Sequence, residues 1–350
     1  MNKINIKGLA RKVINDLKPY KTARDEYIGN GKKMILLDAN ENPFRTEFNR
    51  YPDPNQINLK NNISKIKSIS NSKIFLSNGS NEVFNLLMKI FCEPGIDNII
   101  ICPPTFGMYE ISAKINGINI KKIPLNSEFD FDVDMINIIN KYNSKIIFIP
   151  SPNNPTGNCF SQKKIEMIIN KFNGLVVLDE AYVDYSENKS FLPRLGTYKN
   201  LVITQTFSKA QGMAGIRLGM TFANEEIIEL LDKIRAPYNV NSLTQKSAII
   251  KLNQQEKVKK EARIILREKD KLIAHFKELK FIEKVFPSSA NFILIRVDNS
   301  LKRYNQLIEN NIVVRNTSYL FGCENTLRIT VGLKSENDKL IIALKKINKL

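Results

Sequence analysis

The sequence contains a single histidine, His275, and no tryptophan among its 350 residues. One imidazole cannot build a metal site made of several histidines. His275 lies within the polar run KLIAHFKEL, which has the period of a helix. We therefore expect neither a histidine-based metal site nor a Ser-His-Asp triad, and we place His275 on an ordinary helix face.

Cysteines are few, and long hydrophobic runs are missing. The four cysteines are scattered and form no CxxC pair, which favours free thiols in a reducing compartment (Cys92, Cys102, Cys159 and Cys323). No run approaches the apolar length that spans a bilayer, and the first residues, MNKINIKGLARKVI, lack the apolar core of a signal peptide. We expect a cytoplasmic protein without a membrane partner.

Acidic residues are outnumbered, with 53 Lys and Arg against 35 Asp and Glu, which gives a formal net charge of +18. Such an excess invites a nucleic-acid interpretation. However, the basic residues are spread along the chain and mixed with Asn and Ile, and no nucleic-acid-binding motif is present. We expect no nucleic-acid partner and attribute the charge to a lysine-rich bias, with some part serving an acidic substrate.

The length exceeds what one hydrophobic core usually supports, so we expect one large domain and one smaller domain. Strand and helix patterns alternate, and several strands are continuous apolar runs, such as NIIIC, KIIFIP and LVVLD. This pattern predicts an α/β fold in which helices cover both faces of a mostly parallel sheet. The expected strands are Lys73–Ser77, Asn98–Cys102, Ile118–Ile123, Lys145–Pro150, Leu175–Leu178 and Leu201–Thr204.

A break at Pro237, followed by a helical run from about Thr244 to Leu279, suggests where the large domain ends. We predict a large domain over residues 46–243 and a small α+β domain over 244–350. Residues 1–45 would form an N-terminal arm and part of the small domain. Within this arm helix signals are weak, and Leu36–Pro43 resembles a short strand that runs into a turn.

Polar side chains follow three of the expected strands. Asn154 comes after KIIFIP, Asp179 and Tyr182 come after LVVL, and Lys209 follows LVIT. The carboxyl ends of parallel strands meet at one edge of the sheet, where ligands bind. An amine, a carboxylate, a phenol and an amide together suit an aldehyde cofactor with a pyridine ring and a phosphate.

Two further segments could bind the phosphate of such a cofactor. Arg217 stands between Gly215 and Gly219, which lets the backbone approach a bound anion. The segment Asn78-Gly79-Ser80-Asn81-Glu82 joins a strand to the apolar helix VFNLLMKIF, and the exposed N–H groups of such a junction attract phosphate. A plain helix cap by Ser80 or Asn81 is the alternative for that segment.

The ordered motifs NPTG, DEAY, TFSK and GIRLG resemble the pyridoxal-phosphate aminotransferases of the aspartate aminotransferase fold, fold type I. Within these class II enzymes, six further motifs resemble the histidinol-phosphate aminotransferase family over nearly the whole chain: PYKTAR, LDANENP, RYPDP, EPG with CPPTFGMY, ANF and LRITVG. Each motif alone is weak, whereas the ordered set is specific.

The resemblance implies a role for each matching residue. Lys209 would hold pyridoxal 5′-phosphate covalently, Asp179 would pair with its ring nitrogen, and Asn154 and Tyr182 would bond to its ring oxygen. The implied phosphate ligands are Ser80, Asn81, Ser208 and Arg217. Phe106 would stack on the ring, where the family often has tyrosine, and Asn81 stands where Asp is commoner.

The resemblance also implies a partner and a substrate. Tyr51 would reach the phosphate of the neighbouring subunit's cofactor, which makes the enzyme a homodimer with shared active sites. Tyr20, Asn154, Arg315 and Arg328 would bind the substrate. The implied reaction converts histidinol phosphate and 2-oxoglutarate into imidazole-acetol phosphate and glutamate, a step of histidine biosynthesis.

Three alternatives stay open at this point. Threonine-phosphate decarboxylase and aromatic amino acid aminotransferases share closely similar motifs within the same fold. A cofactor-binding regulator without turnover belongs to another class. The complete set of cofactor residues and the lack of a DNA-binding module argue against a regulator.

Overall fold

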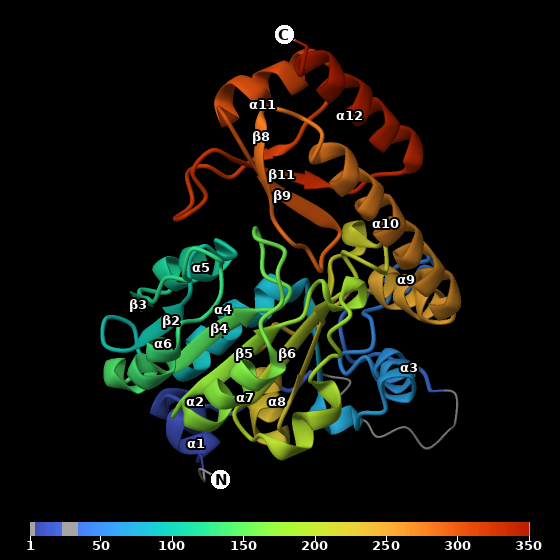
Figure 1. The fold of residues 1–350 in the computed structure, drawn as a ribbon. Coiled ribbons are helices and arrows are strands. Elements are labelled where there is room, and N and C mark those ends of the chain that lie inside the picture. Colours follow the sequence, from blue (N-terminus) through green and yellow to red (C-terminus); the bar gives the residue numbers. More distant parts are fainter. Residues whose placement is uncertain (1–3, 23–33, 350) are drawn as a thin grey trace.

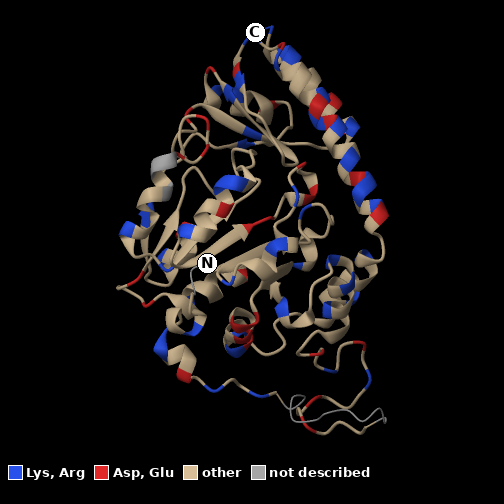
Figure 2. Cartoon of the chain, turned by 60° about the horizontal axis from the view of Figure 1, so that its bottom comes forward, with Lys and Arg blue, Asp and Glu red and all other residues tan. Residues whose placement is uncertain are grey.

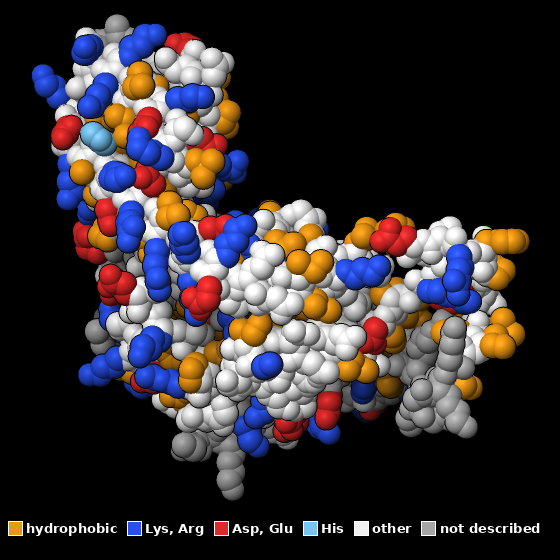
Figure 3. All heavy atoms as spheres, turned by 90° about the vertical axis from the view of Figure 1, so that its right-hand side faces the viewer, with side chains coloured by type: hydrophobic (Ala, Val, Ile, Leu, Met, Phe, Trp, Pro, Cys, Tyr) orange, Lys and Arg blue, Asp and Glu red, His pale blue; other side chains and the backbone are white. Residues whose placement is uncertain are grey.

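The structure, a computed structural model, describes residues 4–22 and 34–349. The chain forms a large domain around a seven-stranded sheet and a small domain around a four-stranded sheet (Figure 1). The long helix α10 (Gln255–Phe276) contacts both domains, because it packs on the 3-10 turn Val183–Tyr185 and on the small sheet. Figure 3 shows the small domain rising from one end of the large domain.

The large sheet is mostly parallel, as predicted. Its strand order is β1 (Ile74–Asn78), β7 (Leu218–Ala223), β6 (Leu201–Thr206), β5 (Leu175–Asp179), β4 (Ile146–Pro150), β2 (Asn98–Ile101) and β3 (Asn119–Lys122). The pairs from β6 to β3 are parallel, whereas β7 is antiparallel to both of its neighbours. The register pairs Pro150 with Asp179 and Asp179 with Thr204, so the ends of β4, β5 and β6 form one rim.

Helices cover both faces of this sheet. One face packs against α4 (Ser80–Phe91), α5 (Met108–Ile115) and α8 (Glu225–Ile234), and the other against α3 (Ile57–Lys67), α6 (Val133–Ile138), α7 (Gln162–Lys171) and α9 (Ser242–Leu252). In β4, Ile146 and Phe148 join the first core, and Ile147 and Ile149 join the second. All of β4 is buried, which is why it has a continuous apolar sequence instead of an alternating one.

The small domain is built on an antiparallel sheet. Its order is β10 (Arg315–Asn316), β11 (Thr326–Thr330), β9 (Phe292–Val297) and β8 (Ile282–Val285), and α10, α11 (Ser300–Glu309) and α12 (Lys334–Ile347) pack on it. Its core of apolar side chains is separate from the two cores of the large sheet. The predicted α/β fold with a second, smaller domain is therefore confirmed.

Two local predictions were wrong. Residues 34–56 contain no strand, although Leu36–Pro43 resembles one. Ile35 and Leu37 are 87% and 88% exposed, so this segment has no sheet against which to bury its alternate residues. The helical run from Thr244 divides into α9 and α10, because the buried residues of α9 face the large-domain core and much of α10 packs on the small sheet.

Three other segments differ from what weak local signals suggested. The N-terminus contains two short helices, α1 (Ile6–Leu9) and α2 (Lys12–Asp16), and the Asn5 side chain caps the first. Ile6, Ala10 and Ile14 join a core of the large domain, not that of the small one. Strand β7 and helix α8 were not anticipated, although Asn224 caps α8 ahead of Glu225 in a recognisable start signal. The domain boundaries as a whole remain a prediction.

Charge is distributed over the whole molecule. Figure 2 shows Lys and Arg on most elements, with Asp and Glu among them. Within the described ranges, none of the helices combines the length and the hydrophobicity that a membrane crossing requires.

Candidate active site

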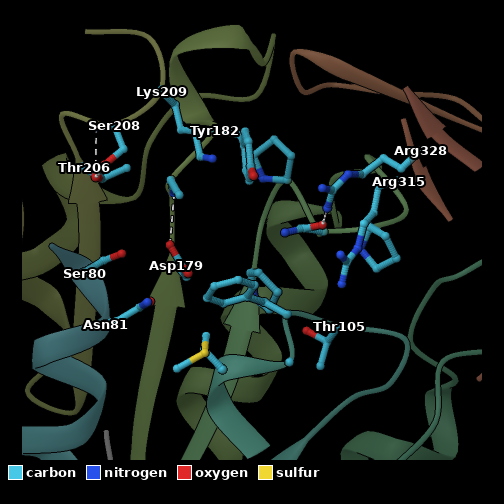
Figure 4. A pocket seen from close by; sticks show the side chains of 18 of the residues that line it. Ser80, Asn81, Thr105, Asp179, Tyr182, Thr206, Ser208, Lys209, Arg315 and Arg328 are labelled. Atoms are coloured by element: carbon cyan, nitrogen blue, oxygen red, sulfur yellow. Dashed lines mark hydrogen bonds between the residues drawn. The ribbon is translucent and has the colours of Figure 1, made fainter. Parts of the chain in front are cut away.

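A cavity of about 590 Å³ lies at the carboxyl ends of β4, β5 and β6, facing the small domain. Residues of both domains line it. Figure 4 shows Arg315 and Arg328 entering from the small-domain strands, Ser80 and Ser208 on the opposite side, and Asp179 and Lys209 between them. The site therefore has two separate ends joined by a central amine and carboxylate.

The first end is a candidate anion cradle at the start of α4. Gly79 occupies the N-cap position, and no side chain caps the helix, so the alternative of a cap by Ser80 or Asn81 is wrong. The first backbone N–H groups of α4 and the positive end of its dipole thus remain available to a ligand. Arg217 lies beside them, with its Nη1 atom 3.5 Å from Ser208 Oγ and 3.2 Å from the carbonyl oxygen of Ala214.

Glycine makes the cradle possible at two positions. A Cβ atom on Gly79 would lie 2.7 Å from Nη2 of Arg217, and Gly79 has a φ of +75°. A Cβ atom on Gly219 would lie 2.6 Å from both the amide nitrogen of Ser80 and Ser77 Oγ. Only a residue without a side chain lets β7 and the start of α4 approach so closely.

Lys209 stands in the centre, in the turn that follows β6. Its Nζ atom lies 5.2 Å from the centroid of the Tyr182 ring. Tyr182 is 8% exposed, and the edge of its ring packs against Phe292 at a centroid distance of 5.2 Å. An amine over an aromatic face, at the mouth of a strand, is in place to meet a ligand that enters between the domains.

Asp179 forms the floor of the cavity at the end of β5. Tyr109 donates a hydrogen bond of 2.7 Å to Oδ2, and the amide of Ala181 donates one of 3.1 Å to Oδ1. Burial raises the pKa of Asp179, whereas both hydrogen bonds and the charge of Lys209 act in the opposite direction. A cationic ligand group near Asp179 would also lower the pKa of this carboxyl.

The second end of the site holds two guanidinium groups. Arg315 and Arg328 are directly opposite in the register of β10 and β11, and among the described residues neither forms a salt bridge. Arg328 donates a hydrogen bond to Asn154 Oδ1 across the domain junction, and Arg315 donates one of 2.9 Å to the Tyr319 hydroxyl. Burial, and also the charge of Arg315, lower the pKa of Arg328. An anionic group on a ligand would neutralise the positive charges of Arg315 and Arg328.

The described residues fit a ligand of the pyridoxal 5′-phosphate type. The cradle offers helix N–H groups, Ser208 and Arg217 to a phosphate, and Lys209 offers an amine to an aldehyde. Asp179 offers a carboxylate to a ring nitrogen. Because Arg328 donates to Oδ1 of Asn154, the Nδ2 atom of that amide remains as a donor for a ring oxygen.

Most of the residues selected from the sequence meet in this cavity. The lining includes Ser80, Asn81, Phe106, Asn154, Asp179, Tyr182, Ser208, Lys209, Arg217, Arg315 and Arg328. Tyr51 and Tyr20 do not line it. Tyr51 is 52% exposed and stacks on Tyr238 with a centroid distance of 4.4 Å, and Tyr20 is 75% exposed. Residues 23–25, within and just after the PYKTAR motif, lie outside the described residues.

Two tyrosines at the site were not selected from the sequence. Tyr109 is fully buried behind Asp179, and Tyr319 lines the cavity beside Arg315. Tyr109 is the last residue of the motif CPPTFGMY, so the motif pointed to the segment without indicating a partner. Tyr319 lies in the loop between β10 and β11, which offers no local signal for its contact with Arg315.

Comparison with known proteins agrees with this geometry. The family model for aminotransferase class I and II matches residues 32–344. A curated relative from Christiangramia forsetii, named histidinol-phosphate aminotransferase, is 49% identical over 347 residues, which are 99% of this chain and 99% of the relative. The resemblance inferred from the motifs is thus confirmed.

Solved structures of similar fold include more than one activity. The crystal structure of the histidinol-phosphate aminotransferase from Clostridium acetobutylicum has a TM-score of 0.80 and 26% identity, covering 86% of this chain and 91% of that one. The L-threonine-O-3-phosphate decarboxylase from Porphyromonas gingivalis has a TM-score of 0.74 and 25% identity, covering 86% and 91%. The chain belongs to the class I and II aminotransferases.

Proposed function

We propose that this chain is a histidinol-phosphate aminotransferase that uses pyridoxal 5′-phosphate. It moves the amino group of histidinol phosphate to 2-oxoglutarate, which gives imidazole-acetol phosphate and glutamate. The observation that carries the proposal is the pair Arg315 and Arg328, which faces a site whose other end is already an anion cradle. Two anion sites on either side of an amine suit a phosphorylated cofactor together with an anionic substrate.

The substrate end suits both amino donors. Histidinol phosphate carries a phosphate and no carboxylate, whereas glutamate carries two carboxylates. Guanidinium groups accept either anion, in part through paired hydrogen bonds. We assign Arg315 mainly to the phosphate of histidinol phosphate and Arg328 to both ligands, since Arg328 also contacts Asn154.

When bound, pyridoxal 5′-phosphate supplies an aldehyde that takes up the amino group and a ring that withdraws electrons from the reacting carbon. Asp179 holds the proton on the ring nitrogen, and its buried position strengthens that pairing. Asn154 and Tyr182 orient the ring oxygen. Lys209 is the base that moves a proton at the carbon bearing the amino group.

We further propose a homodimer in which Tyr51 reaches the cofactor phosphate of the partner subunit. Its position outside the cavity of its own chain and its half-exposed ring support this assignment. Large apolar side chains of the same region are also exposed, including Phe44 at 77% and Leu243 at 55%. Figure 3 shows such hydrophobic groups on the surface of the large domain.

The proposed function is tested by a half-reaction screen. Purified protein loaded with cofactor is mixed with histidinol phosphate, glutamate, threonine phosphate or phenylalanine, and the cofactor absorbance is followed. We expect histidinol phosphate and glutamate to convert the cofactor to its amine form, and Lys209→Ala to abolish both conversions. Release of CO₂ from threonine phosphate, with histidinol phosphate left untouched, would replace this function by the decarboxylase.

A further inference from the structure

We infer that Tyr109 is a positioning residue, whose hydroxyl fixes the carboxylate of Asp179 at the floor of the cavity, where it would pair with the ring nitrogen of the cofactor, and keeps it ionised. The inference rests on the proposed function, because it assigns Asp179 to the ring nitrogen. Tyr109 itself touches neither the cavity nor a substrate, since its side chain is fully buried and does not line the pocket. It acts through Asp179 alone.

The packing of Tyr109 leaves its hydroxyl little freedom. The ring stacks on Phe148 with a centroid distance of 4.7 Å, and the edges of Phe84 and Phe106 meet it at 5.0 and 5.5 Å. The aromatic cage fixes the direction of the C–O bond, and that bond points at Oδ2 of Asp179, 2.7 Å away. Short bonds from a hydroxyl to a carboxylate are the stronger kind.

The electrostatic surroundings explain why Asp179 needs this donor. Burial favours the protonated form of the carboxyl, and a protonated Asp179 could not stabilise a proton on the ring nitrogen. Among the described residues, two titratable groups act on it: Tyr109 from α5, through its hydrogen bond, and Lys209 from the turn after β6, through its charge. Tyr182, from the segment after β5, acts on Tyr109. The hydrogen bond from Tyr109 favours the ionised carboxylate, so its loss would raise the pKa of Asp179 further.

Tyr109 itself remains a donor throughout. Burial, and then the charge of Asp179, raise the pKa of Tyr109 well above its ordinary value. The phenol therefore keeps its proton at every pH at which the enzyme works. A phenylalanine would fill the same cage and lack only the hydroxyl, so the variant Tyr109→Phe isolates the hydrogen bond from the packing.

A matched control is available in the same chain. Tyr185 is 3% exposed, lies outside the cavity lining and belongs to a different apolar cluster from Tyr109. Tyr185→Phe removes a second buried hydroxyl without touching Asp179. Incorporation of 3-fluorotyrosine at position 109 keeps the ring and the hydroxyl, so it is a conservative variant at the same position that retains the hydrogen bond.

The first test measures cofactor affinity by fluorescence titration of the apo-protein, together with the pH profile of kcat. In Tyr109→Phe we expect affinity to fall about 10- to 100-fold, the scale of a hydrogen bond to a charged group. The acid limb of the profile should move to higher pH, and KM should change little because Tyr109 contacts no substrate. Tyr185→Phe and the fluorotyrosine protein should bind cofactor like the wild type.

The second test repeats Tyr109→Phe in an Asp179→Asn background. An amide does not titrate, so the substitution should no longer shift the acid limb, and its effect on cofactor affinity should shrink at least threefold. An equal loss of cofactor affinity in both backgrounds, or an equal loss in Tyr185→Phe, would show that Tyr109 contributes only to core packing and would overturn the inference. Cofactor binding needs no substrate, so a wild type that binds cofactor and ignores histidinol phosphate would refute the proposed function alone.

Discussion

Gly219→Ala is the substitution for which the structure makes the sharpest prediction. Gly219 lies in β7, paired with Ser77 of β1, and the proposed cradle for the cofactor phosphate begins directly beside it. An added Cβ would stand 2.6 Å from the amide nitrogen of Ser80 and 2.7 Å from the carbonyl carbon of Gly79. These neighbours are backbone atoms, so no flexible side chain can swing away, and the start of α4 must shift.

The size of the effect follows from the cost of overpacking. Forcing an extra carbon into a packed site costs about 1–3 kcal/mol. If the shift falls on the N–H groups that hold the phosphate, cofactor affinity should weaken roughly 5- to 140-fold, since about 1.4 kcal/mol corresponds to a factor of ten. Strain from the added Cβ that persists without the cofactor would lower the melting temperature of the apo-protein below that of the wild type.

Gly215→Ala is the matched control, because it lies in the same GIRLG motif and a Cβ there would meet nothing within 4 Å. Both variants are titrated with pyridoxal 5′-phosphate by equilibrium dialysis, and their apo forms are melted by calorimetry. We expect Gly215→Ala to match the wild type in both measurements. Wild-type affinity and stability in Gly219→Ala would show that the close approach of β7 and α4 does not form the phosphate site.

Three further predictions concern charge and assembly. Arg315→Ala should lower kcat/KM for histidinol phosphate about 10- to 100-fold more than for glutamate, whereas Arg328→Ala should impair both half-reactions; equal losses would assign the arginines to the fold. Because burial raises the pKa of Asp179, its contribution to apo-protein stability falls as the pH rises above about 3.9. Apo Asp179→Asn should therefore melt at a higher temperature than the wild type at pH 7 and at no higher temperature near pH 4, which calorimetry at both pH values checks. Mixed Tyr51→Ala and Lys209→Ala subunits should regain activity that neither parent has, and a lack of recovery while labelled subunits exchange would exclude shared sites.

The sequence anticipated those parts of the site that follow directly from strands. Asn154, Asp179 and Lys209 come after apolar runs that had to be neighbouring parallel strands, and the register of β4, β5 and β6 brings their ends together. Buried strands can be recognised in the sequence because their apolar runs are continuous and short. A residue just after such a run lies at the carboxyl edge of the sheet.

Tyr109 and Tyr319 could not be identified in this way. The hydrogen bond from Tyr109 to Asp179 joins residues that are 70 positions apart, and it depends on how α5 packs against the large sheet. The position of Tyr319 depends on the loop between β10 and β11, which carries no strand pattern of its own. Such contacts are set by tertiary packing, for which local propensity is a weak guide.

The composition of the cavity supports the proposal that Lys209 moves the proton. With a single histidine in the chain, on the surface of α10, no imidazole lines the site. The lining arginines keep their protons under all working conditions. Asp179 lies at the floor, engaged by Tyr109 and Ala181. Lys209 supplies the only amine among the lining residues. It lies beside the Tyr182 ring and between the two proposed anion sites, where the proposed function needs a base.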